Sequence, residues 1–146
     1  MDNTAASIEE LDQLNFLADF NPKKTSKRSI LLVEDDDDQR ILFKMMLENS
    51  GYTVHTANSA KNALFLLRHT PVQLIITDIM MPEIDGIEFL KKVKKLPNYN
   101  SVPTIALTAS RVDVENKVCT KYGPDMLCMK NTAIKTLKKQ IEFLLS

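Results

Sequence analysis

Residues 29–146 alternate between short apolar runs and longer segments that carry one apolar face. Apolar or alternating runs bounded by polar residues are typical of strands, and five of them occur, at 30–33, 52–57, 72–77, 102–107 and 126–129. Apolar positions at helical spacing predict helices at 38–50, 87–96 and 132–145, and another that follows a cap at Asn58 or Ser59 and carries Ala63, Leu64, Leu66 and Leu67. A weaker, polar helix is predicted at 110–122. The pattern predicts an α/β fold, a doubly wound five-stranded parallel sheet flanked by five helices.

The helix predicted at 38–50 is rich in apolar residues. Its apolar positions are Ile41, Leu42, Met45, Met46 and Leu47, and Gly51 follows as a typical helix end. Methionine fills irregular gaps in protein interiors. Met45, Met46, Met126 and Met129 are therefore interpreted as core or near-core residues.

Residues 1–28 differ in charge from the rest and are interpreted as an N-terminal extension to a domain at 29–146. Residues 1–20 contain five acidic and no basic side chains, whereas 21–28 contain four basic and no acidic ones and resemble a linker. Ser7 and Glu10 form a capping box, and apolar residues at helical spacing predict an amphipathic helix over 8–20. An isolated helix of this length is marginal in water, so its apolar face needs a partner: its own domain, a second protomer or a target.

Composition excludes several classes of function. The 146 residues carry 19 basic and 19 acidic side chains, so nothing favours direct DNA binding or a membrane surface. No stretch is long and apolar enough to span a bilayer, and the acidic N-terminus does not resemble a secretory signal. The chain has 3 glycines, widely separated, which excludes the glycine-rich phosphate loops of nucleotide-binding proteins. Its 2 cysteines are expected to be thiols in a reducing cytoplasm.

Chemically competent side chains follow the predicted strands. Glu34 and Asp35 follow the first strand, Asp78 the third, Thr108 the fourth and Lys130 the fifth. Ligands of such sheets bind beyond the carboxyl ends of the strands, where the strand order reverses. Three clustered carboxylates favour Mg²⁺, and a carboxylate beside Mg²⁺ and an ammonium can act as a nucleophile toward a phosphoryl group. The residues therefore predict a phosphoryl-accepting site on Asp78.

Two segments resemble the receiver domain of two-component response regulators. They are Leu-Val-Glu-Asp-Asp at 32–36, followed by Arg40, and Ile-Ile-Thr-Asp-Ile-Met-Met-Pro-Glu-Ile-Asp-Gly at 75–86. The resemblance extends over residues 29–146 and implies a flavodoxin-like sheet. It also implies that Asp78 is the phosphoacceptor, that Thr108 and Lys130 assist it, and that Glu34, Asp35, Asp78 and the backbone carbonyl of Met80 hold Mg²⁺.

The resemblance also implies partners. The phosphoryl donor would be a histidine kinase or a histidine phosphotransfer protein, and the domain would catalyse only its own phosphorylation and dephosphorylation. Because no output module follows the last predicted helix, we expect signalling through a downstream protein target or a phosphorelay, with a homodimer as an open possibility. A phosphorylation-independent interaction module is the alternative, although all five characteristic side chains are present. A phosphatase with an Asp-x-Asp motif is disfavoured, because Met80 cannot transfer a proton.

Two positions depart from the habits of that family. Leu127 stands where an aromatic residue is usual, and Asn131 stands where proline is usual. We therefore expect weaker coupling of the site to the surface formed by the fourth predicted helix, the fifth strand and the fifth helix, and a smaller change there on phosphorylation. The Lys130–Asn131 peptide bond is expected to be trans or visibly strained.

Overall fold

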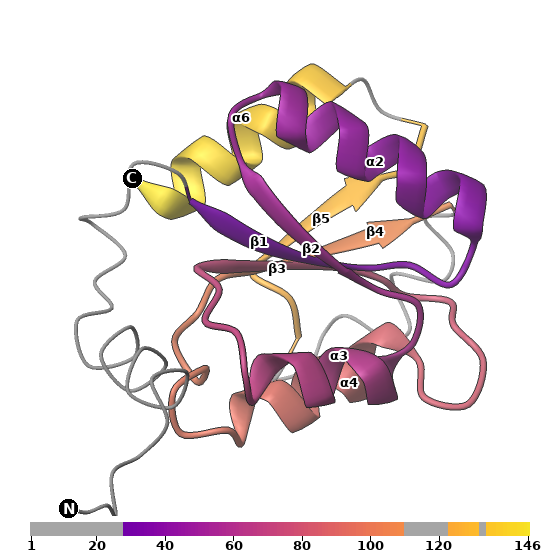
Figure 1. Ribbon diagram of the computed structural model, residues 1–146, viewed down its shortest axis with the longest axis vertical. Coiled ribbons are helices and arrows are strands. Elements are labelled where there is room, and N and C mark those ends of the chain that lie inside the picture. The colour runs from indigo at the N-terminus through magenta and orange to yellow at the C-terminus, as the bar shows by residue number, and fades with distance from the viewer. Residues whose placement is uncertain (1–27, 110–122, 132–133) are drawn as a thin grey trace, which may run out of the picture.

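The computed structural model describes residues 28–109, 123–131 and 134–146 (Figure 1). The helices predicted at 8–20 and 110–122 lie outside these residues. The described strands are β1 (Ser29–Val33), β2 (Thr53–Ala57), β3 (Leu74–Asp78), β4 (Thr104–Thr108) and β5 (Met126–Met129), and the described helices are α2 (Asp37–Asn49), α3 (Ala60–Leu67), α4 (Gly86–Lys94) and α6 (Ile134–Leu145). Every strand predicted from the sequence is present, with ends that shift by at most two residues. No helix in the described part of the chain is both long and apolar enough to cross a bilayer.

The strands form one parallel sheet in the order β2-β1-β3-β4-β5. The chain moves from β1 outward to β2, then returns across β1 to β3, so the order reverses between β1 and β3. The ends of β1 and β3 are in register, with Val33 of β1 opposite Thr77 of β3. Residues that follow β1 and β3 therefore lie side by side at the carboxyl edge of the sheet.

Helices cover both faces of this sheet, α2 and α6 on one and α3 and α4 on the other (Figure 1). Successive side chains of a strand point to opposite faces, and β1 illustrates this. Ile30 and Leu32 pack in the cluster that includes Leu47 of α2, whereas Leu31 and Val33 pack in the cluster that includes Phe89 of α4. Because β1 is apolar on both faces, it lies at the centre of both cores, and its four apolar side chains are 0% exposed.

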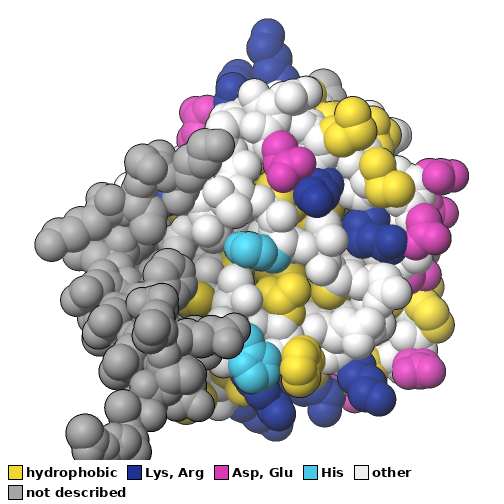
Figure 2. All heavy atoms as spheres, viewed as in Figure 1, with side chains coloured by type: hydrophobic (Ala, Val, Ile, Leu, Met, Phe, Trp, Pro, Cys, Tyr) yellow, Lys and Arg dark blue, Asp and Glu magenta, His cyan; other side chains and the backbone are white. Residues whose placement is uncertain are grey.

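The interpretation of Met45 as a core residue was wrong. Met45 is 57% exposed, and Ile41 and Leu42 are each 55% exposed, whereas Phe43 and Leu47 are the buried residues of α2. Each helical residue turns by about 100°, so Ile41 and Met45 lie opposite Phe43. The helix carries apolar residues on two sides, and periodicity alone could not tell which side faces the sheet. Figure 2 shows hydrophobic side chains exposed over α2, among charged ones.

The end of α2 has the predicted glycine stop. Gly51 has φ +98°, its N–H donates to the carbonyl of Glu48, and the N–H of Tyr52 donates to the carbonyl of Leu47. This pair of hydrogen bonds defines a Schellman motif, which satisfies carbonyls that the helix leaves without partners. Tyr52 and Leu47 also pack in the same core cluster. The turn therefore aims the chain from α2 into β2.

We expect Gly51→Ala to lower the free energy of unfolding by about 1 kcal/mol, because the left-handed conformation costs a residue with a Cβ atom roughly this much. No atom lies within 4 Å of the added Cβ, so the cost is conformational and not steric. Urea unfolding monitored by circular dichroism measures the effect. Gly51→Asn is the matched control and should lose less, since asparagine tolerates this conformation. Equal stability of Gly51→Ala and the unsubstituted chain would contradict this explanation.

Candidate functional site

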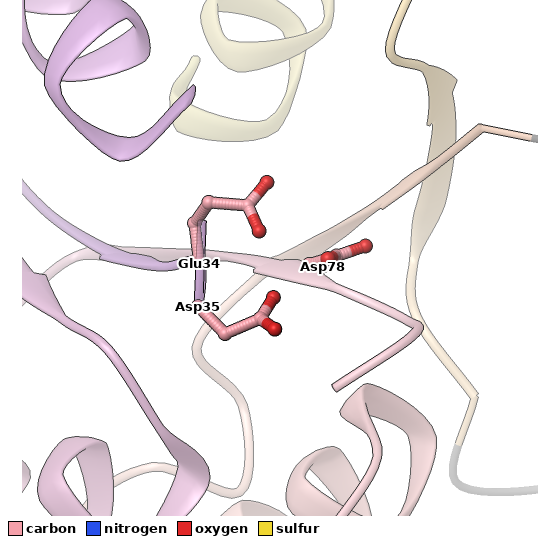
Figure 3. A group of neighbouring side chains, drawn as sticks. All are labelled: Glu34, Asp35 and Asp78. Atoms are coloured by element: carbon pink, nitrogen blue, oxygen red, sulfur yellow. The ribbon is translucent and has the colours of Figure 1, made fainter. Parts of the chain in front are cut away.

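The reversal of strand order positions three carboxylates at one edge of the sheet. Glu34 and Asp35 directly follow β1, and Asp78 is the last residue of β3. One oxygen from each lies within 4.8 Å of the others, and Glu34 and Asp35 project toward Asp78 (Figure 3). Glu34 is 0% and Asp78 4% exposed, whereas Asp35 is exposed. The cluster therefore has a buried floor and one side chain open to solvent.

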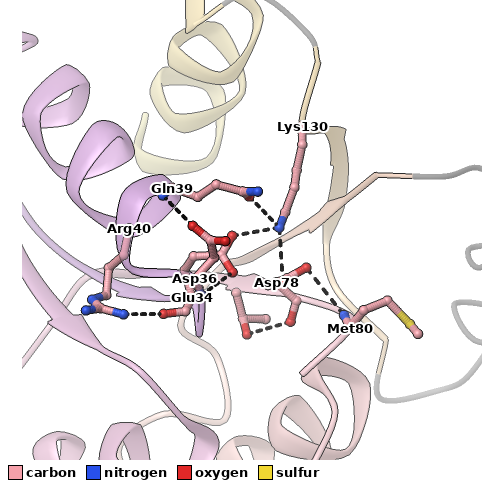
Figure 4. A network of polar contacts seen from close by, with 8 residues as sticks. Glu34, Asp36, Gln39, Arg40, Asp78, Met80 and Lys130 are labelled. Atoms are coloured by element: carbon pink, nitrogen blue, oxygen red, sulfur yellow. Dashed lines mark hydrogen bonds and ion pairs between the residues drawn. The ribbon is translucent and has the colours of Figure 1, made fainter. Parts of the chain in front are cut away.

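Lys130, which directly follows the edge strand β5, brings a positive charge to this cluster (Figure 4). Its Nζ lies 2.7 Å from Oε1 of Glu34 and 3.1 Å from Oδ2 of Asp78. Its backbone N–H donates to the carbonyl of Thr108 at 2.8 Å, which continues the pairing of β4 and β5 beyond the strands. The ammonium thus joins residues of β1 and β3 to the end of β5.

One ammonium does not neutralise three carboxylates. Burial raises the pKa of Glu34 from 4.5 to about 7, since its contact with Lys130 only partly offsets the lost hydration and Asp78 repels the charged form. Burial also acts to lower the pKa of Lys130, but its hydrogen bond to Glu34 and the nearby charge of Asp78 outweigh this and raise it. Lys130 is therefore charged, and its single positive charge does not balance the negative charge of the three carboxyl groups.

A tight loop after β3 fixes the position of Asp78. The N–H of Gly86 donates to the carbonyl of Ile79 at 2.8 Å, and a Cβ atom at position 86 would lie 2.0 Å from the carbonyl oxygen of Asp78. Only glycine allows this approach. Asp85 caps α4 by accepting a hydrogen bond from the N–H of Glu88. The Asp-Gly pair that was part of the sequence motif therefore shapes the loop, as its residue types predicted.

The remaining predicted residues lie at the same edge. Thr108 is the last residue of β4 and is fully buried. The N–H of Met80 donates to Oδ1 of Asp78 at 3.3 Å, and its side chain is 52% exposed. Within the described residues there is no cis peptide bond, so the Lys130–Asn131 bond is trans, and Lys130 still reaches both carboxylates. Leu127 packs beside Ile79, Ile87 and Ala106.

Sequence reasoning missed Gln39, whose Oε1 accepts a hydrogen bond from Nζ of Lys130 at 2.8 Å. The run of aspartates before Gln39 indicates that a helix begins there. It does not indicate where the glutamine side chain points. Asp36 is the N-cap of α2, and Asp37 and Asp38 occupy its first turn, where negative charge is favourable. Gln39 is therefore the third residue of α2, and its side chain reaches the ammonium of Lys130 (Figure 4).

Comparisons with known proteins agree with this geometry. Residues 30–142 match the family described as response regulator receiver domain. An uncharacterized 14.6 kDa protein of Leptolyngbya boryana is 39% identical over 98 residues, which cover 67% of this chain and 75% of that protein. The transcriptional regulatory protein AfsQ1 of Streptomyces coelicolor is 34% identical over 117 residues, 80% of this chain but 51% of the relative, so this chain spans about half its length. The crystal structure of response regulator protein TrrA of Thermotoga maritima, in complex with Mg²⁺-BeF, has a TM-score of 0.73 and 28% identity over 80% of this chain and 98% of TrrA.

The chain belongs to the response regulator receiver domain family, and the fold and function class implied by the motifs are confirmed. The sheet is of the flavodoxin-like type expected for that family.

The donor set suits a magnesium ion. Carboxylate oxygens are hard ligands, and the oxygens of Glu34, Asp35 and Asp78 are close enough to share one cation. Burial, together with the repulsion from Asp78, raises the pKa of Glu34, and a nearby cation would favour its charged form. Residues that could hold Mg²⁺ are therefore present, and the carbonyl of Met80 stays a prediction as a further ligand.

We expect Mg²⁺ binding to strengthen as the pH rises from about 5 to about 7 and then to level off. A cation must displace the proton of Glu34, whose pKa in the folded protein is about 7. Without metal, the same group has the opposite effect on folding: an unfolded chain releases this proton near 4.5, so stability due to Glu34 falls between 4.5 and about 7.

Isothermal titration calorimetry at several pH values measures this dependence. Glu34→Gln should bind Mg²⁺ more weakly and should lose most of the pH dependence. If the unsubstituted protein binds Mg²⁺ with the same affinity at pH 5 and pH 7, to within about twofold, Glu34 does not compete with the metal for a proton.

Proposed function

We propose that Asp78 accepts a phosphoryl group from a phosphohistidine of a histidine kinase or a histidine phosphotransfer protein. The observation that carries this proposal is the position of Asp78, almost buried, between the ammonium of Lys130 and two further carboxylates. An ion pair with no chemical role would not need a third carboxylate, that of Asp35, beside the two that Lys130 contacts. The family assignment supports the same reaction.

The reaction follows from the positions of the side chains. An oxygen of Asp78 attacks phosphorus, the bond from phosphorus to the donor's imidazole nitrogen breaks, and the imidazole leaves with the electron pair. Lys130 lies 3.1 Å from Asp78 and can follow the phosphoryl oxygens as they arrive. Thr108, at the end of β4, is proposed to donate a hydrogen bond from its hydroxyl group to another of these oxygens. Mg²⁺, held by Glu34 and Asp35 as well as Asp78, would supply the positive charge that the cluster lacks.

The domain then acts on others only through its phosphorylated state. We propose a downstream protein target or a phosphorelay as its output, with no enzymatic activity beyond phosphorylation and dephosphorylation of Asp78. Binding of Mg²⁺-BeF by TrrA supports an equivalent Mg²⁺ site here. Cys128 is a free, buried thiol, which suits the cytoplasm, the compartment that we propose.

Asp78→Asn should abolish phosphorylation. We expect the unsubstituted protein, incubated with Mg²⁺ and acetyl phosphate, to gain the mass of one phosphoryl group, since a small donor needs no docking surface. The asparagine variant should gain none, because its amide is a poor nucleophile. Intact-mass spectrometry checks both, with Asp38→Asn as a matched control that is exposed in the first turn of α2 and should be modified normally. An unmodified wild-type protein would favour the phosphorylation-independent interaction module.

The exposed apolar residues of α2, Ile41, Leu42 and Met45, are proposed to contact the protein donor. They lie within two to three turns of the start of α2, which directly follows the carboxylates, so a donor that reaches Asp78 passes close to them. Ile41→Glu with Met45→Glu should slow transfer from a cognate phosphohistidine protein at least tenfold and leave phosphorylation by acetyl phosphate unchanged. The double change Lys61→Glu with Lys91→Glu, on α3 and α4, is the control. Equal rates of protein-donor transfer in both variants would exclude α2 as the docking surface.

A further inference from the structure

We infer that Gln39 is a positioning residue that holds the ammonium of Lys130 in place over Asp78 while the charges around it change. This inference rests on the proposed phosphoacceptor function of Asp78. Its physical basis is a hydrogen bond from Nζ of Lys130 to Oε1 of Gln39 at 2.8 Å, which joins residues 91 positions apart in the chain (Figure 4).

The start of α2 leaves the carboxamide of Gln39 free to make this contact. Asp36 is the N-cap, and its Oδ1 accepts the backbone N–H of Gln39 at 2.9 Å, which fixes the main chain of Gln39. A glutamine at this third helical position commonly turns back to bind the N–H of the N-cap residue. Here that N–H donates to Oε2 of Glu34 instead, at 3.3 Å. Because Glu34 takes this role, the side chain of Gln39 can extend toward Lys130.

The acceptors around Lys130 are matched to its donors. An ammonium has three N–H groups, and three oxygens lie near this one, on Glu34 at 2.7 Å, Gln39 at 2.8 Å and Asp78 at 3.1 Å. An ammonium only donates, so the amide must present its oxygen. Arg40 does not compete for this oxygen, since its guanidinium binds the carbonyl of Glu34 and the carboxylate of Asp37.

Only one of these three acceptors keeps its chemistry through the proposed reaction. Asp78 becomes an acyl phosphate, and Glu34 shares its oxygens with a cation. The amide of Gln39 is neutral, does not react and is a poor competitor for Mg²⁺ beside carboxylates. It is therefore the constant attachment of the Lys130 ammonium, and it restricts the motion of a long, flexible side chain.

Gln39→Met tests this role. Methionine has a similar length and helix propensity but no strong acceptor. Phosphorylation by acetyl phosphate at saturating Mg²⁺ should slow roughly three- to tenfold, the effect of one net hydrogen bond. In a Lys130→Met background, adding Gln39→Met should change the rate by less than about twofold, because Gln39 acts through Lys130. Glu48→Met, at an exposed position of the same helix, is the control and should have no effect.

A second measurement does not depend on phosphorylation. The ¹⁵N resonance of the Lys130 ammonium in the isotope-labelled protein should shift and broaden in Gln39→Met, and should be retained in Gln39→Glu, which keeps an acceptor oxygen. An unchanged Lys130 signal in Gln39→Met, or equal losses in the methionine and glutamate variants, overturns the inference. If the unsubstituted protein is not phosphorylated at all, the proposed function fails, and the resonance still decides whether Gln39 positions Lys130.

Discussion

The contact of one ammonium with two buried carboxylates connects the parts of this fold on which its function depends. Lys130 follows the last strand, Glu34 follows the first, and Asp78 ends the third. They meet because all strands are parallel and their order reverses between β1 and β3, so that every carboxyl end opens at the same edge. The apolar core on both faces of β1 keeps this edge in place, since Glu34 directly follows four buried apolar residues.

The carboxyl edge of the sheet carries more negative than positive charge, with three carboxylates and one ammonium in the cluster. Burial favours the neutral form of a carboxyl group. Lys130 only partly offsets this effect at Glu34, whose pKa is raised to about 7. A cation, or a phosphoryl group on Asp78, would change that balance. Gly86 allows the backbone after Asp78 to close tightly, and Gln39 and Arg40 hold Lys130 and Glu34 from the side of α2. Residues that follow β1 and β3 therefore also set the geometry of the site.

Much of this could be predicted from the sequence, because strand ends in an α/β sheet converge by topology alone. The acids, the threonine and the lysine were assigned to one edge without any knowledge of side-chain directions. The orientation of α2 could not be predicted, since Phe43 and Leu47 compete with Ile41 and Met45 for the sheet and both pairs have helical spacing. Gln39 was missed for a similar reason. Its side chain is free to reach Lys130 because Glu34, and not Gln39, accepts the hydrogen bond from the N–H of Asp36, and the sequence pattern does not record this contact. The roles of Asp78, Thr108 and Lys130 in phosphoryl transfer stay predictions.

The most direct test of the central claim is to locate the phosphoryl group. After incubation with Mg²⁺ and acetyl phosphate, borohydride reduces an aspartyl phosphate to homoserine, which is stable to proteolysis and can be placed in a peptide by tandem mass spectrometry. The account predicts homoserine at position 78 and unchanged Asp35 and Glu34. Homoserine at another aspartate position, or none in a protein that has gained phosphate, would contradict the assignment of Asp78 as the acceptor.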